Sequence, residues 1–416
     1  MLVLALAFLL VPVGSAWADP TDEGEGAQRN GFLESVCPGE PAPYPEISGN
    51  GPDGELLPPQ SRDVVAGSPD GLQPDQSLYG QYGTSGLQWH VVRENCMSKM
   101  GSSAITTLTN TTWDLSKTIN QSTITVYQAA TSDGLLANFN RVVEDAVAEL
   151  REGIWRPLLP TVFILGAVWL GWYGLIRKRV TLTIESAVWM VLATALGLWI
   201  LVNPGQILGL GAQLVNSGGQ LINTAVSRVP SAASVSSCPA GAPAVEKAEW
   251  ESENDFAARK NSQMLWSTLL CQPWVAGQFG SGKLGALAEQ EHGVALIGAQ
   301  AFSRDELTRM EEEGEDLTEA RIEEKQEEYS RITEEIRGSY PEVAPIYEGN
   351  QQSHRFGVAV LALFSAVFAG GLILAGSVAL IVLKIGFLLM MLLSPVFLLI
   401  GIHPGYGRSV LLRWGR

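Results

Sequence analysis

The sequence predicts a mainly α-helical, polytopic membrane protein with an extracytoplasmic α-helical loop domain and a disordered N-terminal tail. Two long apolar blocks, residues 157–202 and 356–402, are the main observation behind this prediction. About 20 apolar residues cross the hydrocarbon core of a bilayer, so each block is long enough for a pair of transmembrane helices. Most of the acidic residues lie between the blocks, so residues 203–355 are expected to form an acidic extracytoplasmic helical domain.

The net charge of the chain limits its partners. Its 416 residues include 43 Asp and Glu against 27 Lys and Arg, which gives a formal net charge of −16. Phosphate groups are bound mainly by Lys and Arg side chains. This charge therefore argues against direct nucleic-acid binding by the soluble parts.

Residues 1–18 are typical of a secretory signal peptide. Residues 2–13 form a short apolar core, and the small residues Ala16 and Ala18 make a cleavage site before Asp19. A basic region before the core is missing, so an uncleaved membrane anchor is the alternative interpretation.

Residues 19–130 are expected to form a largely disordered extracytoplasmic tail. Nine prolines lie between Pro38 and Pro74 among many Gly, Asp and Ser residues. Such a stretch buries too little apolar surface to offset its chain entropy. The Thr-rich part, residues 84–130, is ambiguous, because weak helical spacing of apolar residues competes with the strand preference of Thr.

The pattern of residues 131–156 predicts an amphipathic helix, which leads into a predicted transmembrane hairpin at 157–202. Apolar residues recur at helical spacing between Leu136 and Leu150. The hairpin is interrupted by the densest basic cluster of the chain, which consists of Arg177, Lys178 and Arg179. The positive-inside rule therefore puts the hairpin tip in the cytoplasm.

The acidic domain at 203–355 carries signals for the start and end of a Glu-rich helix. Ser303 and Glu306 have the spacing of a capping box. The helix is expected to end near Arg337 and Gly338, and Gly314 is expected to divide it in two.

Four cysteines flank the membrane blocks. Cys37 and Cys96 precede the first block, and Cys238 and Cys271 lie between the blocks. If the signal exports the N-terminal region, two spans return the chain to the same oxidising side, where disulfides persist. The simplest pairing is Cys37 with Cys96 and Cys238 with Cys271, although three connectivities are possible. Four unpaired thiols are the alternative.

The second apolar block, 356–402, predicts a transmembrane pair with spans near 357–380 and 386–402. Small residues at four-residue spacing predict seams where helices pack closely in lipid. One row consists of Ala362, Ala366 and Gly370, and the other of Gly371, Ala375 and Ala379. The competing interpretation is composition alone, because Ala and Gly are common in membrane helices.

The basic C-terminal segment, 403–416, conflicts with the expected number of spans. Four spans after an exported N-terminus place this segment outside, whereas Arg408, Arg413 and Arg416 favour the cytoplasm. An interfacial segment at 403–416 or a re-entrant segment at 386–402 would each remove the conflict.

Two ionisable residues, Glu185 and Lys384, lie within or near the apolar segments and are candidates for a pore or coupling role. A charge at membrane depth must face protein or water. The alternative is that both lie near an interface and extend their charged ends toward water. The sequence shows no metal-ligand spacing around its histidines and no catalytic constellation, so no enzyme, cofactor or metal site is expected.

Three stretches of the chain resemble a known family. The first is RVVEDAVAELREGIWRPLLP at 141–160, before the span that ends in the RKR tip. The others are CQPWVAGQFG at 271–280 with GAQAFSRDE at 298–306, and LLSPVFLLIGIHPGYGR at 392–408. Together they resemble the actinobacterial branch of the TrbL-like proteins, which are related to the sixth VirB subunit. The resemblance covers roughly residues 134–416.

The resemblance implies an oligomeric channel or scaffold subunit of a type IV secretion or conjugation system in the cell membrane. Its partners would be other channel proteins, ATPases and a coupling protein, with DNA or protein as the passing substrate. The family pattern implies further membrane helices beyond Arg416. The alternatives are a membrane-anchored surface protein that binds an extracellular partner and a secondary transporter built from inverted repeats.

Overall fold

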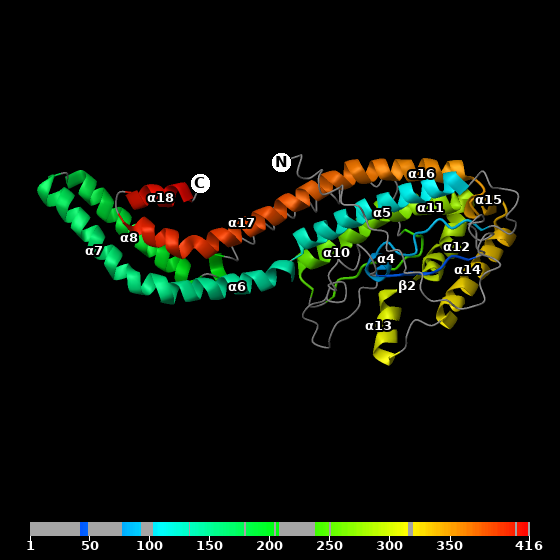
Figure 1. Ribbon diagram of the computed structural model, residues 1–416, viewed down its shortest axis with the longest axis horizontal. Helices are drawn as coiled ribbons and strands as arrows, with labels where there is room; N and C mark the ends of the chain where they lie inside the picture. The colour runs from blue at the N-terminus through cyan, green and yellow to red at the C-terminus, as the bar shows by residue number, and fades with distance from the viewer. Residues whose placement is uncertain are drawn as a thin grey trace, which may run out of the picture.

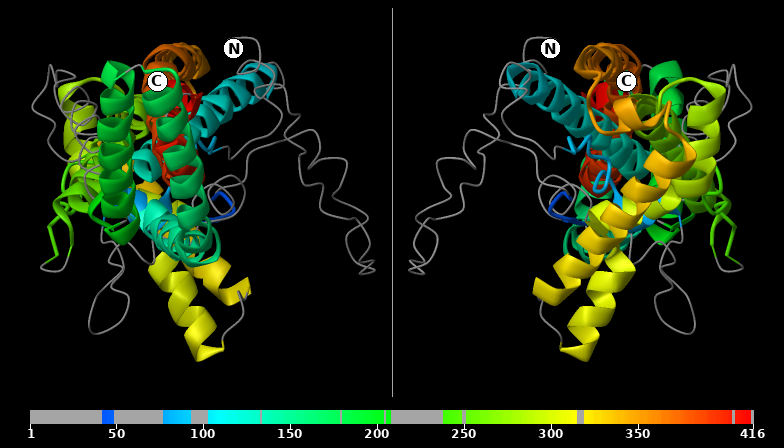
Figure 2. Two further views of the ribbon diagram at one scale, coloured as in Figure 1. Left: turned by 90° about the vertical axis from the view of Figure 1, so that its left-hand side faces the viewer. Right: turned by 90° about the vertical axis from the view of Figure 1, so that its right-hand side faces the viewer.

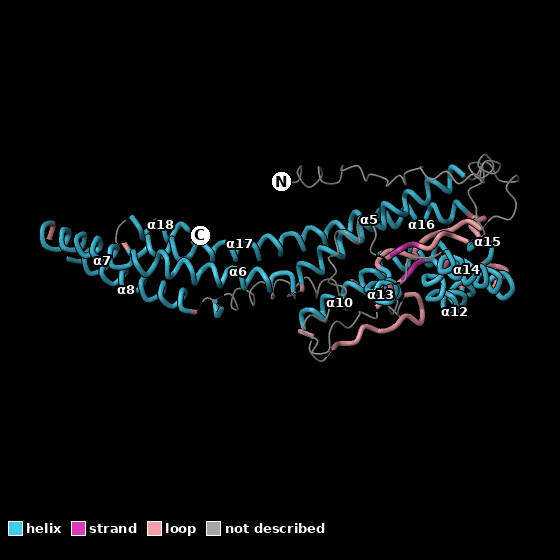
Figure 3. Tube along the Cα trace, turned by 60° about the horizontal axis from the view of Figure 1, so that its bottom comes forward, coloured by secondary structure: helices cyan, strands magenta, loops and turns pink. Residues whose placement is uncertain are grey.

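Figure 1 shows an elongated helical molecule with a broad assembly at one end and a narrow one at the other. The computed structural model describes residues 42–48, 77–92, 103–132, 134–178, 180–203, 205–207, 238–248, 251–314, 319–403 and 406–414. Helices make up most of these residues, and Figure 3 shows the two short strands among them.

We call the broad end the head. Its helices are α4 (Leu78–Tyr82), α5 (Ser103–Thr131), α10 (Glu253–Trp266), α11 (Gln272–Phe279), α12 (Lys283–Gln300), α13 (Arg304–Glu313), α14 (Glu319–Ser339), α15 (Ala344–Tyr347) and α16 (Gln352–Ser365). A π-helical turn, η7 (Ser267–Cys271), joins α10 to α11. Strand β1 (Glu46–Ile47) pairs in parallel with β2 (Ala301–Phe302) and holds the N-terminal segment on the head.

We call the narrow end the arm. It consists of α6 (Gly134–Leu150), η5 (Arg151–Trp155), α7 (Arg156–Gly171), η6 (Trp172–Ile176), α8 (Val180–Val202), α18 (Tyr406–Trp414) and the second half of α17 (Gly371–Ile402). The turn η8 (Ala366–Gly370) joins α16 to α17. The predicted amphipathic helix, α6, is thus continuous through η5 with α7, the first helix of the predicted hairpin, and α8 is the second helix.

Three helical stretches among the described residues are long and apolar enough to cross a membrane. They are Val142–Ile176, Thr183–Val202 and Gln352–Ile402. The last is one unbroken helix, so the expected division of the second block into spans at 357–380 and 386–402 is wrong. The division relied on Lys384, but this side chain is buried, so its charge requires no loop.

The Thr-rich segment forms α5, one of the longest helices of the head. Several of its hydroxyl groups donate to the carbonyl oxygens four residues earlier, as Thr109 does to Ile105 and Thr131 to Tyr127. This bonding satisfies the hydroxyls inside a helix and offsets the usual preference of Thr for strands. The expectation of a largely disordered 19–130 is therefore wrong for residues 42–48, 77–92 and 103–130.

Tryptophan side chains hold the segment 77–92 in the core of the head. The indole nitrogens of Trp113 and Trp266 donate to the carbonyls of Leu87 and Gly83 at 2.8 and 2.6 Å. The rings of Trp89 and Trp113 stack with their centroids 4.5 Å apart. Because each indole is buried with its N–H paired, the core gains apolar contact without an unsatisfied donor.

Candidate functional site

The arm is the candidate functional region, because the hairpin, α17 and α18 meet there. Its core comprises mainly Val143, Val147, Trp155, Met190, Leu201, Leu388, Met391, Leu399 and Ile402. The outer surface of the hairpin is also apolar, with Val168, Leu175 and Val191 exposed by 66%, 82% and 68%. Apolar residues on both the inside and the outside of a helical hairpin are typical of a membrane-embedded segment.

Arg408 binds the C-terminal helix to α8. One terminal nitrogen of its guanidinium group lies 2.5 Å from a carboxylate oxygen of Glu185, and the group lies over the ring of Trp189 at 5.1 Å. The Trp189 indole nitrogen in turn donates to the carbonyl of Gly401 at 3.0 Å. Glu185 is thus paired with the basic segment. Sequence reasoning treated the two separately, because they are 223 positions apart in the chain.

The basic residues of the tip lie at the same end of α8 as Glu185. Arg177 and Lys178 are exposed, and Arg179 lies outside the described residues. Arg177 covers the ring of Tyr173 at 5.5 Å. The pairing of Arg408 with Glu185 therefore brings the C-terminal segment toward the basic tip.

Lys384 lies where α5 ends and α6 begins, rather than between two spans. Its side chain is 9% exposed, and its ammonium group donates to the carbonyl oxygen of Ser132 at 3.4 Å. A positive charge near the carbonyl end of a helix is favourable, because the helix dipole is negative there. This placement connects the head to the arm.

The two rows of small residues have different surroundings. Ala362 and Ala366 are buried, and a Cβ atom added to Gly370 would lie 3.2 Å from the Thr123 hydroxyl oxygen. This row therefore lies in the contact with α5. A Cβ atom at Gly371 would meet nothing within 4 Å, and Ala375 is exposed, so the second row makes no such contact.

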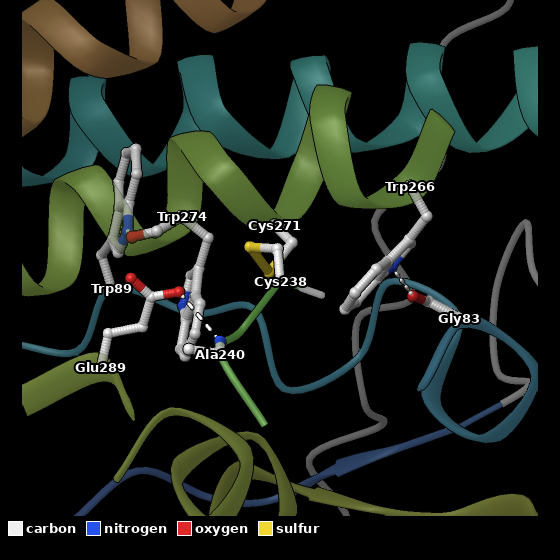
Figure 4. Close-up of a disulfide and its surroundings, with 8 residues drawn as sticks. All are labelled: Gly83, Trp89, Cys238, Ala240, Trp266, Cys271, Trp274 and Glu289. Atoms are coloured by element: carbon white, nitrogen blue, oxygen red, sulfur yellow. Dashed lines mark hydrogen bonds between the residues drawn. A yellow bond between two sulfur atoms is a disulfide. The ribbon is translucent and has the colours of Figure 1, made fainter. Parts of the chain in front are cut away.

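Cys238 and Cys271 form a disulfide with their Cα atoms 5.9 Å apart, as the simplest pairing predicts. Figure 4 shows this disulfide between Trp266 and Trp274. Nearby, the backbone N–H of Ala240 donates to a Glu289 carboxylate oxygen at 3.1 Å. Burial of Glu289 raises its pKa, and the hydrogen bond from Ala240 opposes this shift. Cys37 and Cys96 lie outside the described residues, so their pairing stays a prediction.

A charged cleft of about 780 Å³ lies between α12, α13 and α14, and sequence reasoning did not find it. Lys325 lies in this cleft and donates to Glu306 at 2.8 Å and to the carbonyl of Gly298 at 2.9 Å. Burial raises the pKa of Glu306, but hydrogen bonds from Lys325 and from the Ser303 backbone outweigh it, so the pKa is lowered overall. No group of three or more metal-ligating side chains occurs among the described residues.

Comparison of the chain with protein-family models, with curated proteins and with solved structures finds no match.

Proposed function

We propose that this chain is a membrane channel or scaffold subunit of a type IV secretion system, as its sequence resemblance implies. The observation that carries the proposal is the single helix Gln352–Ile402, which begins in the core of the head and ends in the arm. Such a helix couples a domain outside the membrane rigidly to helices inside it. This coupling is what a subunit needs if it positions other components around a translocation path.

The number of crossing helices supports a topology with the head outside and the hairpin tip inside. With α7, α8 and α17 crossing once each, three spans follow the exported N-terminal region. Arg408 and Arg413 then lie on the side of the tip, in agreement with the positive-inside rule. The conflict that four spans created is thereby removed. The Cys238–Cys271 disulfide supports an oxidising compartment for the head.

Single cysteines test this topology in whole cells. We expect Glu312→Cys, exposed on α13, to react with an impermeant thiol reagent in intact cells. We expect Lys178→Cys and Arg413→Cys to react only after the membrane is permeabilised. Labelling of Lys178→Cys in intact cells would contradict the topology, and the unsubstituted chain supplies the background of the native cysteines.

Copurification tests the function itself. The tagged full chain, solubilised from the membrane of its own cells, is expected to recover a secretion ATPase, a coupling protein or another channel subunit. A tagged polytopic protein of the same membrane with an unrelated role is the matched control. Recovery of none of these partners would count against the proposal.

The charged cleft favours a second candidate function, a membrane-anchored receptor whose head binds an extracellular partner. Its volume of about 780 Å³ is ample for a small ligand or a peptide side chain. The two functions differ in the effect of deleting the gene. Unchanged DNA or protein transfer in the deletion strain would favour the receptor, and loss of transfer would favour the secretion subunit.

A further inference from the structure

One long side of α16 and α17 is apolar and has no partner among the residues that the structure describes. We call it the outer face and define it by its exposed large residues, Leu361, Phe364, Phe368, Leu372, Val382 and Leu383. Their exposed fractions range from 58% to 77%. No residue between Arg355 and Lys384 is charged. The opposite side of the same helix carries Ala362, Ala366 and Gly370, which pack against α5.

The first half of the outer face lies at the level of the head, away from the hairpin. Thr123 of α5 donates to the carbonyl of Gly370, and Ser132 accepts from Lys384, so the two helices run parallel. Thr123 and Gly370 are in contact, and Asp114 and Leu361 lie equally many residues before them in the two parallel helices. Asp114 and Leu361 therefore lie at the same height along the helix axes. Asp114 is 62% exposed and pairs with Lys117 at 2.9 Å. Lys117 is only 12% exposed, so the exposed group is the Asp114 carboxylate, and an exposed carboxylate indicates water rather than lipid at this level.

The part of the outer face at the level of the head is an apolar surface in water and requires a partner, because soluble surfaces rarely leave a continuous apolar patch on the order of 300 Å² or more without a binding role. With the part along α17 included, the six side chains present on the order of 600 Å² of accessible surface, which approaches the roughly 800 Å² per partner of a standard protein interface. The partner must itself be uncharged along the whole face, since a charge buried there would be unpaired.

We propose that the outer face packs against the outer face of a second copy of this chain. The face itself meets the requirement for an uncharged apolar partner. Two copies in one membrane share an orientation, so a two-fold axis along the helices puts equal positions of the two chains opposite each other. Gly371, Ala375 and Ala379 lie along this side, and small residues let two helix backbones approach closely.

The charge distribution of the head is compatible with this pairing. The acidic helices α13 and α14 extend from the side of the head opposite to α16, as Figures 1 and 2 show. Pairing through α16 and α17 therefore keeps these helices of the two copies apart and limits their repulsion. The inference concerns contact between copies of this chain and does not depend on which translocation system contains it.

Disulfide cross-linking in native membranes tests the pairing. Leu372→Cys in the full chain is expected to give, on oxidation, a covalent dimer several-fold above the level of the unsubstituted chain, whose native cysteines set the background. Leu287→Cys on α12, 50% exposed, and Val168→Cys on the hairpin are matched controls and are expected to stay at the background.

A water-soluble maleimide separates the other outcomes. We expect Leu372→Cys to be protected from it before oxidation. Labelling without a cross-link would mean that the face is open to water, and protection without a cross-link would mean that lipid or another protein covers it. Either result would overturn the proposal.

A second variant measures the mass of the detergent-solubilised protein. The unsubstituted chain is expected to have the mass of two copies, and Phe368→Glu the mass of one, because the substitution buries two like charges at the contact. Leu287→Glu is expected to leave the dimer intact, and tryptophan fluorescence checks that both variants are folded. A single-copy mass for the unsubstituted chain, or a dimer that survives Phe368→Glu, would contradict the proposed contact.

Discussion

The ammonium group of Lys384 lies 3.4 Å from the carbonyl oxygen of Ser132, between the end of α5 and the start of α6. This contact joins the only charged residue of the second apolar block to the junction between head and arm. The charge thus has a structural role in the chain, at the point where three long helices meet.

Replacing Lys384 by Met is expected to destabilise the junction, because the Ser132 carbonyl loses a charged donor while a side chain of similar length remains. A lost buried hydrogen bond of this kind costs about 1–3 kcal/mol. Circular dichroism during heating in detergent measures the change in the unfolding midpoint. Lys283→Met, at an exposed position on α12, is the control. Loss of transfer with unchanged stability would instead assign Lys384 to a pore or coupling role.

Removing the Cys238–Cys271 disulfide is expected to destabilise the head. The bond joins residues 33 positions apart, and a closed loop of this length restricts the unfolded chain by about 3–4 kcal/mol. Urea unfolding followed by tryptophan fluorescence compares Cys238→Ser/Cys271→Ser with the unsubstituted chain. Cys37→Ser/Cys96→Ser tests the other predicted pair in the same assay. An unchanged midpoint for the first double variant would mean that the bond adds no stability.

Gly277 is expected to tolerate no side chain. A Cβ atom added there would lie 2.3 Å from a ring carbon of Trp89, inside the packed core. Gly277→Ala should therefore destabilise the head by about 1–3 kcal/mol. Gly338→Ala in α14 is the matched control, because its Cβ meets nothing within 4 Å and alanine favours the helix by about 1 kcal/mol. Thermal unfolding should move in opposite directions for the two variants.

The contribution of Glu306 to stability is expected to depend on pH. Its pKa is lower in the folded protein than in the unfolded chain, so its stabilisation is complete above the unfolded pKa, which is about 4.3. The stabilisation is lost as the pH falls through the folded pKa. The difference in unfolding midpoint between the unsubstituted chain and Glu306→Gln should therefore shrink from pH 7 to pH 3. Glu312→Gln, exposed on α13, should show no such change.

Short-range signals in the sequence predicted several elements correctly. The Ser303–Glu306 capping box has both of its hydrogen bonds, and Gly314 ends α13 in a left-handed conformation with φ of 66°. The hairpin turns at the predicted basic tip, with α8 beginning at Val180. Each of these features depends on residues a few positions apart, where backbone geometry and local hydrogen bonds decide the outcome.

The errors concern segments whose structure depends on distant contacts. The polar residues of α5 suggested a disordered or strand-forming segment, but the helix is stabilised by burial against α10 and by contact with the small-residue row of α16 and η8. The second apolar block was predicted to form two spans because Lys384, its only charged residue, was interpreted as the end of a helix. In the folded chain the Ser132 carbonyl at the end of α5 accepts a hydrogen bond from the Lys384 ammonium group, and α17 continues past this residue.

The sequence by itself determined that the chain is mainly helical, where the apolar segments lie, and where α13 begins and ends. Hydrophobic periodicity and helix capping involve residues within a few turns of each other, so both can be recognised in the sequence. Only the tertiary structure decided that α5 belongs to the head, that Arg408 meets Glu185, and that no described residue covers one side of α16 and α17. These outcomes depend on which surfaces meet across more than 200 residues, and such pairings are selected by shape and burial rather than by any local pattern.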